Sequence, residues 1–181
     1  MTASITLKIA ACAILAGATP AFSHISLEEG SAAAGSYYKA VFRVSHGCAG
    51  SATTGLSVQL PAGFQGAKPM PKAGWALATQ VEKLAISLES HGKTVTEAVA
   101  LIRWTAGSRE AALADTHYDE FVLYGKLPEQ AGPLWFKVLQ TCETGRNDWS
   151  ERPAAGTSTK GLKAPAVLLD VKPAEAGRHQ H

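Results

Sequence analysis

The 181-residue chain carries 17 lysines and arginines against 15 aspartates and glutamates, a formal net charge of +2. This near balance gives no indication of the strongly basic surface that is typical of nucleic-acid-binding proteins. The chain also has no phosphate-binding loop, nucleophile elbow or His-Glu-x-x-His motif, which argues against the common enzyme classes that carry them.

Residues 1–23 are predicted to be an export signal. The apolar run 9–18 is about ten residues long, whereas a membrane span needs roughly 20. Small residues at Ala21 and Ser23 predict cleavage after Ser23, which makes His24 the first residue of the mature protein. A cut after Ala21 is the alternative, and it would leave the same histidine third in the chain, where its own amine is no longer free to chelate.

The cysteines support export. Of the three, Cys12 leaves with the signal, so Cys48 and Cys142 remain as an even pair in a compartment where disulfides persist. A bridge between them would close a loop of about 95 residues and contribute about 4–5 kcal/mol in the chain-entropy model. Two buried thiols, or a metal site with two cysteines, are the alternatives. The mature chain is predicted to be a periplasmic or secreted protein with no membrane span.

Hydrophobic alternation with a period of two predicts strands along most of the mature chain. The strands, in chain order, are expected at 38–44, 56–60, 75–77, 84–88, 94–104, 121–124, 134–139 and 166–171. One short helix is expected at 109–114. Strands at roughly ten-residue spacing between Gly/Pro turns predict an all-β fold, an antiparallel β-sandwich of one domain over 24–171. Residues 172–181 are predicted to be a disordered tail.

Several segments, taken together, resemble the YcnI-like copper-binding domain family of exported bacterial proteins. They occur in the family's order between about residues 24 and 155. The matching segments are 24–28 (HISLE), 34–41 (AGSYYKAV), 46–51 (HGCAGS), 53–56 (TTGL), 68–75 (KPMPKAGW), 118–121 (YDEF) and 142–149 (CETGRNDW). The resemblance implies an immunoglobulin-like β-sandwich. It also implies a Cu(II) site built on the N-terminal histidine, here His24, with a tryptophan, here Trp149, close to it.

An N-terminal histidine offers its α-amine and its ring Nδ1 to one metal ion in a six-membered chelate. Both nitrogens must be deprotonated to bind. Two nitrogen donors suit tetragonal Cu(II), and copper heads the divalent affinity order. The candidate further ligands are Glu28, Glu29, His46, Asp119 and Glu120. Of these, His46 and Glu120 are selected as the predicted ligands beside His24.

Each of these residues also has a structural interpretation. His46 can be a turn histidine that packs on the disulfide, and Glu120 can make a structural hydrogen bond at the start of a strand. Trp149 lies in a polar segment where no strand is evident, so it either caps the metal site or covers the open end of the sandwich. Trp75, Trp104 and Trp135 lie in alternating segments and are expected in the core.

The predicted function is a Cu(II)-binding protein for copper delivery, storage or resistance in the cell envelope, without enzymatic activity. A copper chaperone or a copper transporter of the envelope is the expected partner. Because only Met1 and Met70 occur, a thioether Cu(I) site is not expected. The alternatives are a copper-dependent mono-oxygenase of histidine-brace type and a metal-independent interaction module of the envelope.

Overall fold

The strands of this protein form two packed sheets in a computed structural model that describes residues 24–90 and 92–174. The predicted signal peptide and residues 175–181 of the predicted tail lie outside these ranges. The described residues contain no α-helix, and therefore none long and apolar enough to cross a membrane. The strands are β1 (Ser26–Leu27), β2 (Ser31–Ala33), β3 (Tyr37–Val44), β4 (Thr53–Gln59), β5 (Gln65–Pro69), β6 (Trp75–Ser90), β7 (Lys93–Ala106), β8 (Asp119–Lys126), β9 (Gly132–Cys142), β10 (Arg146–Trp149) and β11 (Val167–Lys172).

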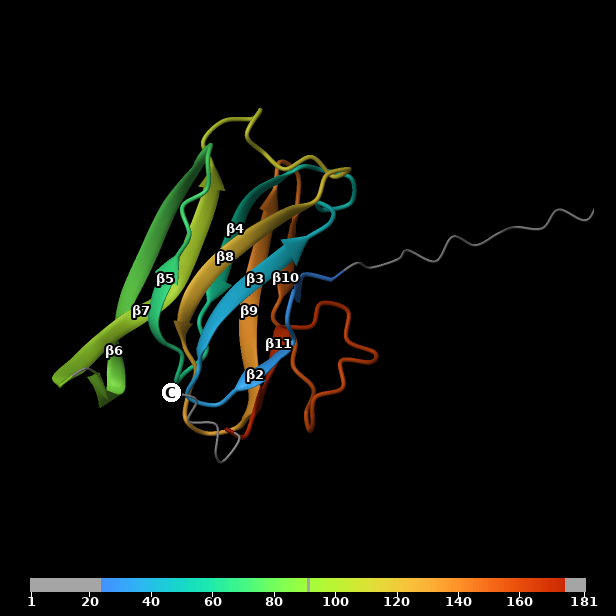
Figure 1. The fold of residues 1–181 in the computed structure, drawn as a ribbon. Coiled ribbons are helices and arrows are strands. Elements are labelled where there is room, and N and C mark those ends of the chain that lie inside the picture. The colour runs from blue at the N-terminus through green and yellow to red at the C-terminus, as the bar shows by residue number, and fades with distance from the viewer. Residues whose placement is uncertain (1–23, 91, 175–181) are drawn as a thin grey trace, which may run out of the picture.

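The two sheets lie face to face as a sandwich (Figure 1). The smaller sheet has the strand order β1-β3-β8-β5 and is antiparallel throughout. The larger sheet has the order β2-β11-β9-β4-β7-β6, and β10 pairs with β9 beside this path. Its pairing of β2 with β11 is parallel, and its other pairings are antiparallel. The all-β sandwich expected from the sequence is confirmed.

One face of β3 explains how the sheets meet. Tyr38, Ala40, Phe42 and Val44 all point into the core and are at most 4% exposed. Phe42 packs edge-to-face on Phe136 of β9 in the opposite sheet, with ring centroids 5.4 Å apart. The burial of such large side chains from both layers is the main stabilising contribution to a sandwich core.

The prediction of a helix at 109–114 is wrong. This segment consists of bends and turns, and Leu113 makes an isolated bridge to Thr53 of β4 instead. Both backbone hydrogen bonds of this bridge form, at 2.8 and 2.9 Å, and Leu113 is buried. The bridge satisfies the backbone groups and buries the leucine, so the segment needs no helical hydrogen bonds.

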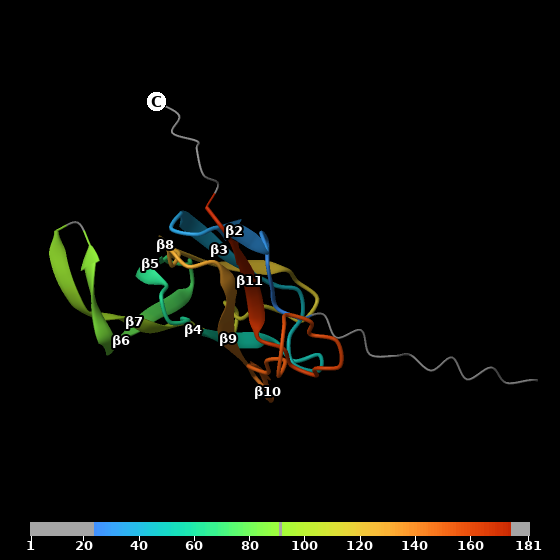
Figure 2. The same ribbon diagram turned by 90° about the horizontal axis from the view of Figure 1, so that it is seen from below.

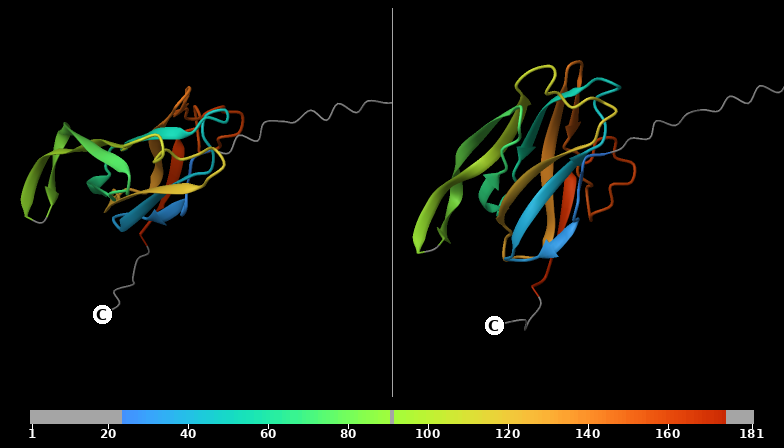
Figure 3. Two further views of the ribbon diagram at one scale, coloured as in Figure 1. Left: turned by 90° about the horizontal axis from the view of Figure 1, so that it is seen from above. Right: turned by 45° about the horizontal axis from the view of Figure 1, so that its top comes forward.

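The strands expected at 75–77 and 84–88 are one continuous strand, β6. With β7 it forms a long hairpin whose turn end projects away from the sandwich (Figure 3). Trp75 and Trp104, at the sandwich end of this hairpin, are buried as expected. Trp135 is only half-buried, because it occupies an outward position of β9.

Candidate functional site

His24 lies against Trp149. The two ring centroids are 5.4 Å apart and the ring planes meet at 82°, an edge-to-face contact. The histidine is exposed, whereas the next residue, Ile25, is buried and begins the anchored part of the chain. Ser26 then pairs with Arg43 of β3, whose guanidinium donates to Ser26 Oγ at 3.3 Å. The chain is therefore held in place immediately after His24.

Trp149 belongs to a strand, where the sequence suggested a polar loop. It ends β10 opposite Val138 of β9 and is only 2% exposed. In β10 the exposed Arg146 and Asp148 alternate with the inward-facing Asn147 and Trp149. Because one of the two inward residues is polar, the alternation does not stand out in the sequence.

Gln140, which sequence reasoning missed, holds the indole of Trp149 in place. Its side chain is fully buried at an inward position of β9 and makes four hydrogen bonds. Its Nε2 donates to the carbonyl oxygen of His46 at 2.7 Å and to Thr53 Oγ1 at 2.8 Å. Its Oε1 accepts from Trp149 Nε1 and from Asn147 Nδ2, each at 3.3 Å. The signal that could have revealed it is a polar residue at a core position between Val138 and Cys142.

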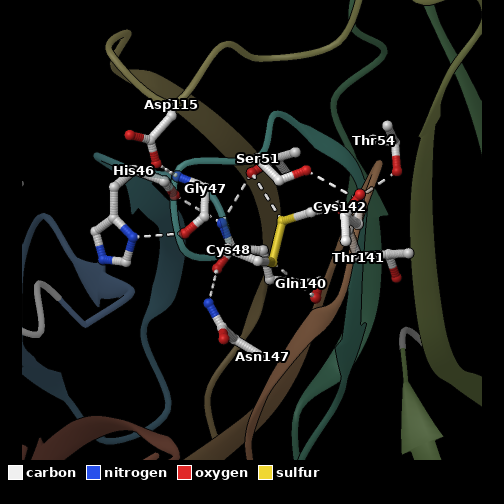
Figure 4. The surroundings of a disulfide bond; sticks show 12 residues. His46, Gly47, Cys48, Ser51, Thr54, Asp115, Gln140, Thr141, Cys142 and Asn147 are labelled. Atoms are coloured by element: carbon white, nitrogen blue, oxygen red, sulfur yellow. Dashed lines mark hydrogen bonds between the residues drawn. A yellow bond between two sulfur atoms is a disulfide. The ribbon is translucent and has the colours of Figure 1, made fainter.

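A disulfide joins Cys48 to Cys142 beside Gln140, as predicted (Figure 4). Its Cα atoms are 5.9 Å apart, within the normal range for a disulfide. Cys48 and Ser51 exchange two backbone hydrogen bonds around a two-residue turn, and both turn residues, Ala49 and Gly50, have positive φ. Such a turn is typical of a tight hairpin. Because disulfides persist in oxidising compartments, the bond indicates an extracytoplasmic location.

The residues before the disulfide hold His46 at the same end of the sandwich. The Nδ1 of His46 lies 2.7 Å from the carbonyl oxygen of Gly47, so Nδ1 is the protonated nitrogen in this contact. Gly47 donates its N–H to Asp115 Oδ1 at 2.8 Å (Figure 4). A Cβ at Gly47 would lie 1.8 Å from the carbonyl oxygen of Ser51, so only glycine fits here.

A groove of about 640 Å³ runs past these residues. Its walls include His46, Asp115, Asn147, Trp149 and Lys163. His46 and Trp149 therefore line one groove, because β10 pairs with β9 and the disulfide ties the His46 segment to the end of β9. The two residues are about a hundred positions apart, so the sequence does not reveal that they are close.

Glu120 lies elsewhere, on the outer face of the smaller sheet. It pairs with Arg43 across β3 and β8, and its Oε1 accepts a hydrogen bond of 2.6 Å from Tyr118 Oη. That bond raises the pKa of Tyr118 above its ordinary value. The adjacent Asp119 forms an ion pair of 2.6 Å with Lys72. Glu120 thus makes a structural hydrogen bond at the start of its strand, and its role as a ligand stays a prediction.

The structure brings His24 to Trp149 but does not join the predicted ligands into one cluster. Within residues 24–90 and 92–174, no three histidine, cysteine, aspartate or glutamate side chains form a group that could hold a metal ion. His24, His46 and Glu120 are therefore not a preassembled set of three side chains. The chelate from the amine and the imidazole of a single residue requires no such cluster.

The two packed sheets define a β-sandwich, and a solved structure shows that it is immunoglobulin-like. The chain is similar to a crystal structure of an uncharacterized protein from Nocardia farcinica that has an immunoglobulin-like fold, with a TM-score of 0.62 and 25% sequence identity over 82% of this chain and 97% of that chain. A second crystal structure, of a protein from Corynebacterium diphtheriae, is similar with a TM-score of 0.39 and 9% identity over 84% of this chain and 35% of that chain. The fold assignment rests on the first of these.

Residues 24–171 match the family described as Domain of unknown function (DUF1775), and the chain belongs to this family. None of the curated proteins matches it.

Proposed function

We propose that the protein is an exported Cu(II)-binding protein of the periplasm or the extracellular space, which serves copper delivery, storage or resistance. The α-amine and the ring Nδ1 of His24 would hold the ion once the signal peptide is removed. The observation that carries this proposal is the contact between the exposed imidazole of His24 and the buried indole of Trp149.

The chemistry of His24 fits Cu(II). The residue supplies two nitrogen donors by itself, and its exposed side chain leaves them accessible to an incoming ion. The buried Ile25 and the pairing of Ser26 with Arg43 hold the following backbone. An ion bound at His24 would therefore be kept at a defined place on the surface.

Trp149 would shield the bound ion from one side. Its ring is fixed by Gln140, so contact with His24 requires little further ordering of the indole. An aromatic face near a cation contributes about 0.5–2 kcal/mol, the upper value applying where water is excluded. This contribution favours retention of the ion without adding a ligand bond.

A carrier role requires partners that give and take copper. A copper chaperone or a copper transporter of the cell envelope has the matching chemistry, because both exchange the ion between ligand sets. In this proposal the protein itself catalyses no reaction.

The test is a Cu(II) titration of the mature protein beginning at His24, followed by calorimetry and by the copper spectrum. We expect one tight Cu(II) per chain and weaker Zn(II) binding. His24→Ala should abolish the tight site. The matched control carries an acetyl group on the α-amine of His24, which keeps the imidazole and removes the free amine from the chelate, and it should bind nearly as poorly.

Two results would overturn the proposal. Unchanged affinity in both variants would mean that copper binds elsewhere. If the mature protein binds no copper, a metal-independent interaction module becomes the favoured function. Reductant-dependent production of hydrogen peroxide coupled to oxidation of a glycan would instead identify a mono-oxygenase.

A further inference from the structure

The outer face of the smaller sheet carries most of the exposed aromatic surface. Of the five large hydrophobic side chains that are prominently exposed in the described residues, Tyr37, Tyr118 and Tyr124 lie on β3 or β8 or next to them, and Met70 directly follows β5. Figure 2 shows β3 and β8 on the side of the sandwich opposite β4 and β9. An exposed apolar group of this kind often marks an interaction site.

Two of these tyrosines are stacked and are flanked by lysines. The rings of Tyr37 and Tyr124 are parallel to within 2°, with centroids 5.4 Å apart, and the side chains are 56% and 45% exposed. Tyr124 pairs with Lys39 on one side and with Lys68 on the other, and both lysines are exposed. The register therefore builds a row of lysine, tyrosine and lysine across three strands.

A third lysine completes what we call the tyrosine face, which consists of Tyr37, Lys39, Lys68, Tyr124 and Lys126. Lys126 pairs with Tyr37 and is partly neutralised by an ion pair of 2.8 Å with Glu129. The face is therefore aromatic and net positive. A second copy of the chain is a poor occupant, because symmetric packing would bring the lysines of both copies together.

We propose that the tyrosine face docks on the surface of an anionic phospholipid bilayer. Tyrosine is favoured at membrane interfaces, where its ring meets apolar material and its hydroxyl stays in water. Lysines beside such rings are attracted to anionic headgroups. This peripheral contact is independent of copper binding and involves no segment that crosses the bilayer.

The docked orientation leaves the candidate metal site free. β3 runs from Tyr37 to Val44, about 23 Å by strand rise, and His46 follows two residues later. Ser26, two residues after His24, pairs with Arg43 near this far end. His24 and the disulfide therefore lie away from the tyrosine face, and His24 remains accessible to a partner protein.

The experiment is co-sedimentation of the mature protein with vesicles of phosphatidylglycerol and phosphatidylcholine in equal parts, beside vesicles of phosphatidylcholine alone. We expect binding to the anionic vesicles only, and release at about 1 M salt, where the Debye length falls to about 3 Å. The double variant Lys39→Gln/Lys68→Gln should weaken binding about 25-fold, at about five-fold per lysine. Tyr37→Ser/Tyr124→Ser should also weaken it.

The matched control is Lys137→Gln/Lys160→Gln, which removes the same charge from exposed positions outside the tyrosine face and should bind like the wild type. Thermal melting checks that every variant is folded. Equal losses in both lysine pairs, equal binding to neutral vesicles, or binding to a soluble acidic polymer but not to vesicles would each overturn the proposal.

Discussion

Replacing Gln140 by leucine should be the most damaging single change near the candidate site. The substitution keeps a side chain of similar size but removes all four hydrogen bonds of the amide. Trp149 and Thr53 are 2% and 0% exposed, so water cannot replace the lost partner of Trp149 Nε1, and Thr53 Oγ1 keeps only its weak contact of 3.9 Å with Cys142 Sγ. A buried polar group that loses its partner costs about 1–3 kcal/mol, which gives an expected loss of about 2–6 kcal/mol for the two groups.

The other two partners should contribute less. The carbonyl oxygen of His46 and the amide of Asn147 belong to half-buried residues that line the groove, where water can take the place of the glutamine. The assay is urea unfolding of wild type and Gln140→Leu, followed by tryptophan fluorescence. Gln59→Leu, at an exposed position of β4, is the matched control and should stay within about 0.5 kcal/mol of the wild type.

A second substitution at the same position separates lost hydrogen bonds from lost packing. In Gln140→Glu the carboxylate can still accept from Trp149 Nε1 but can no longer donate to Thr53 Oγ1. Burial raises the folded-state pKa of this carboxyl, so its protonated form is favoured and stability falls as the pH rises through that pKa. A loss under about 1 kcal/mol in Gln140→Leu, or a pH-independent Gln140→Glu, would refute this account of the network.

Three further predictions concern residues that stabilise the domain. Replacing Cys48 and Cys142 by serine should lower the free energy of unfolding by about 4–5 kcal/mol, because the cysteines are 94 residues apart; equal urea midpoints for reduced and oxidised protein would contradict this. Burial raises the pKa of Tyr38 from 10.0 to about 12, so the neutral phenol contributes stability that is complete below pH 10 and lost as the pH rises through 12. This shift corresponds to about 3 kcal/mol, and Tyr38→Phe should abolish the added alkaline loss in unfolding curves measured across that window. Gly47→Ala should cost about 1–3 kcal/mol because its Cβ meets the carbonyl of Ser51, and a wild-type melting temperature would argue against the close contact.

Much of the fold could be predicted from the sequence because most inward positions are apolar. In β3 every second residue from Tyr38 to Val44 is buried, so alternation alone reveals both the strand and its core face. The helix at 109–114 was mispredicted because local spacing carries no information on the bridge between Leu113 and Thr53, which are far apart in the sequence.

The candidate site was harder to predict because its supporting residues are polar. Gln140 and Asn147 face inward and bond to each other, and this pairing is visible only when β10 lies beside β9. The sequence suggested His24 and Trp149 through a resemblance. It did not show that a buried amide holds the indole of Trp149.

The last strand of the described residues is an interior strand of the larger sheet. β11 lies between β2, its parallel partner near the start of the domain, and β9. During synthesis, a chain that has not yet left the ribosome as far as residue 172 lacks β11, the strand that joins β2 to β9. Until then β2 has no partner in the larger sheet. Such long-range pairing slows folding. We therefore expect the domain to complete its fold only after its whole length is released, and truncation within β11 to prevent cooperative folding.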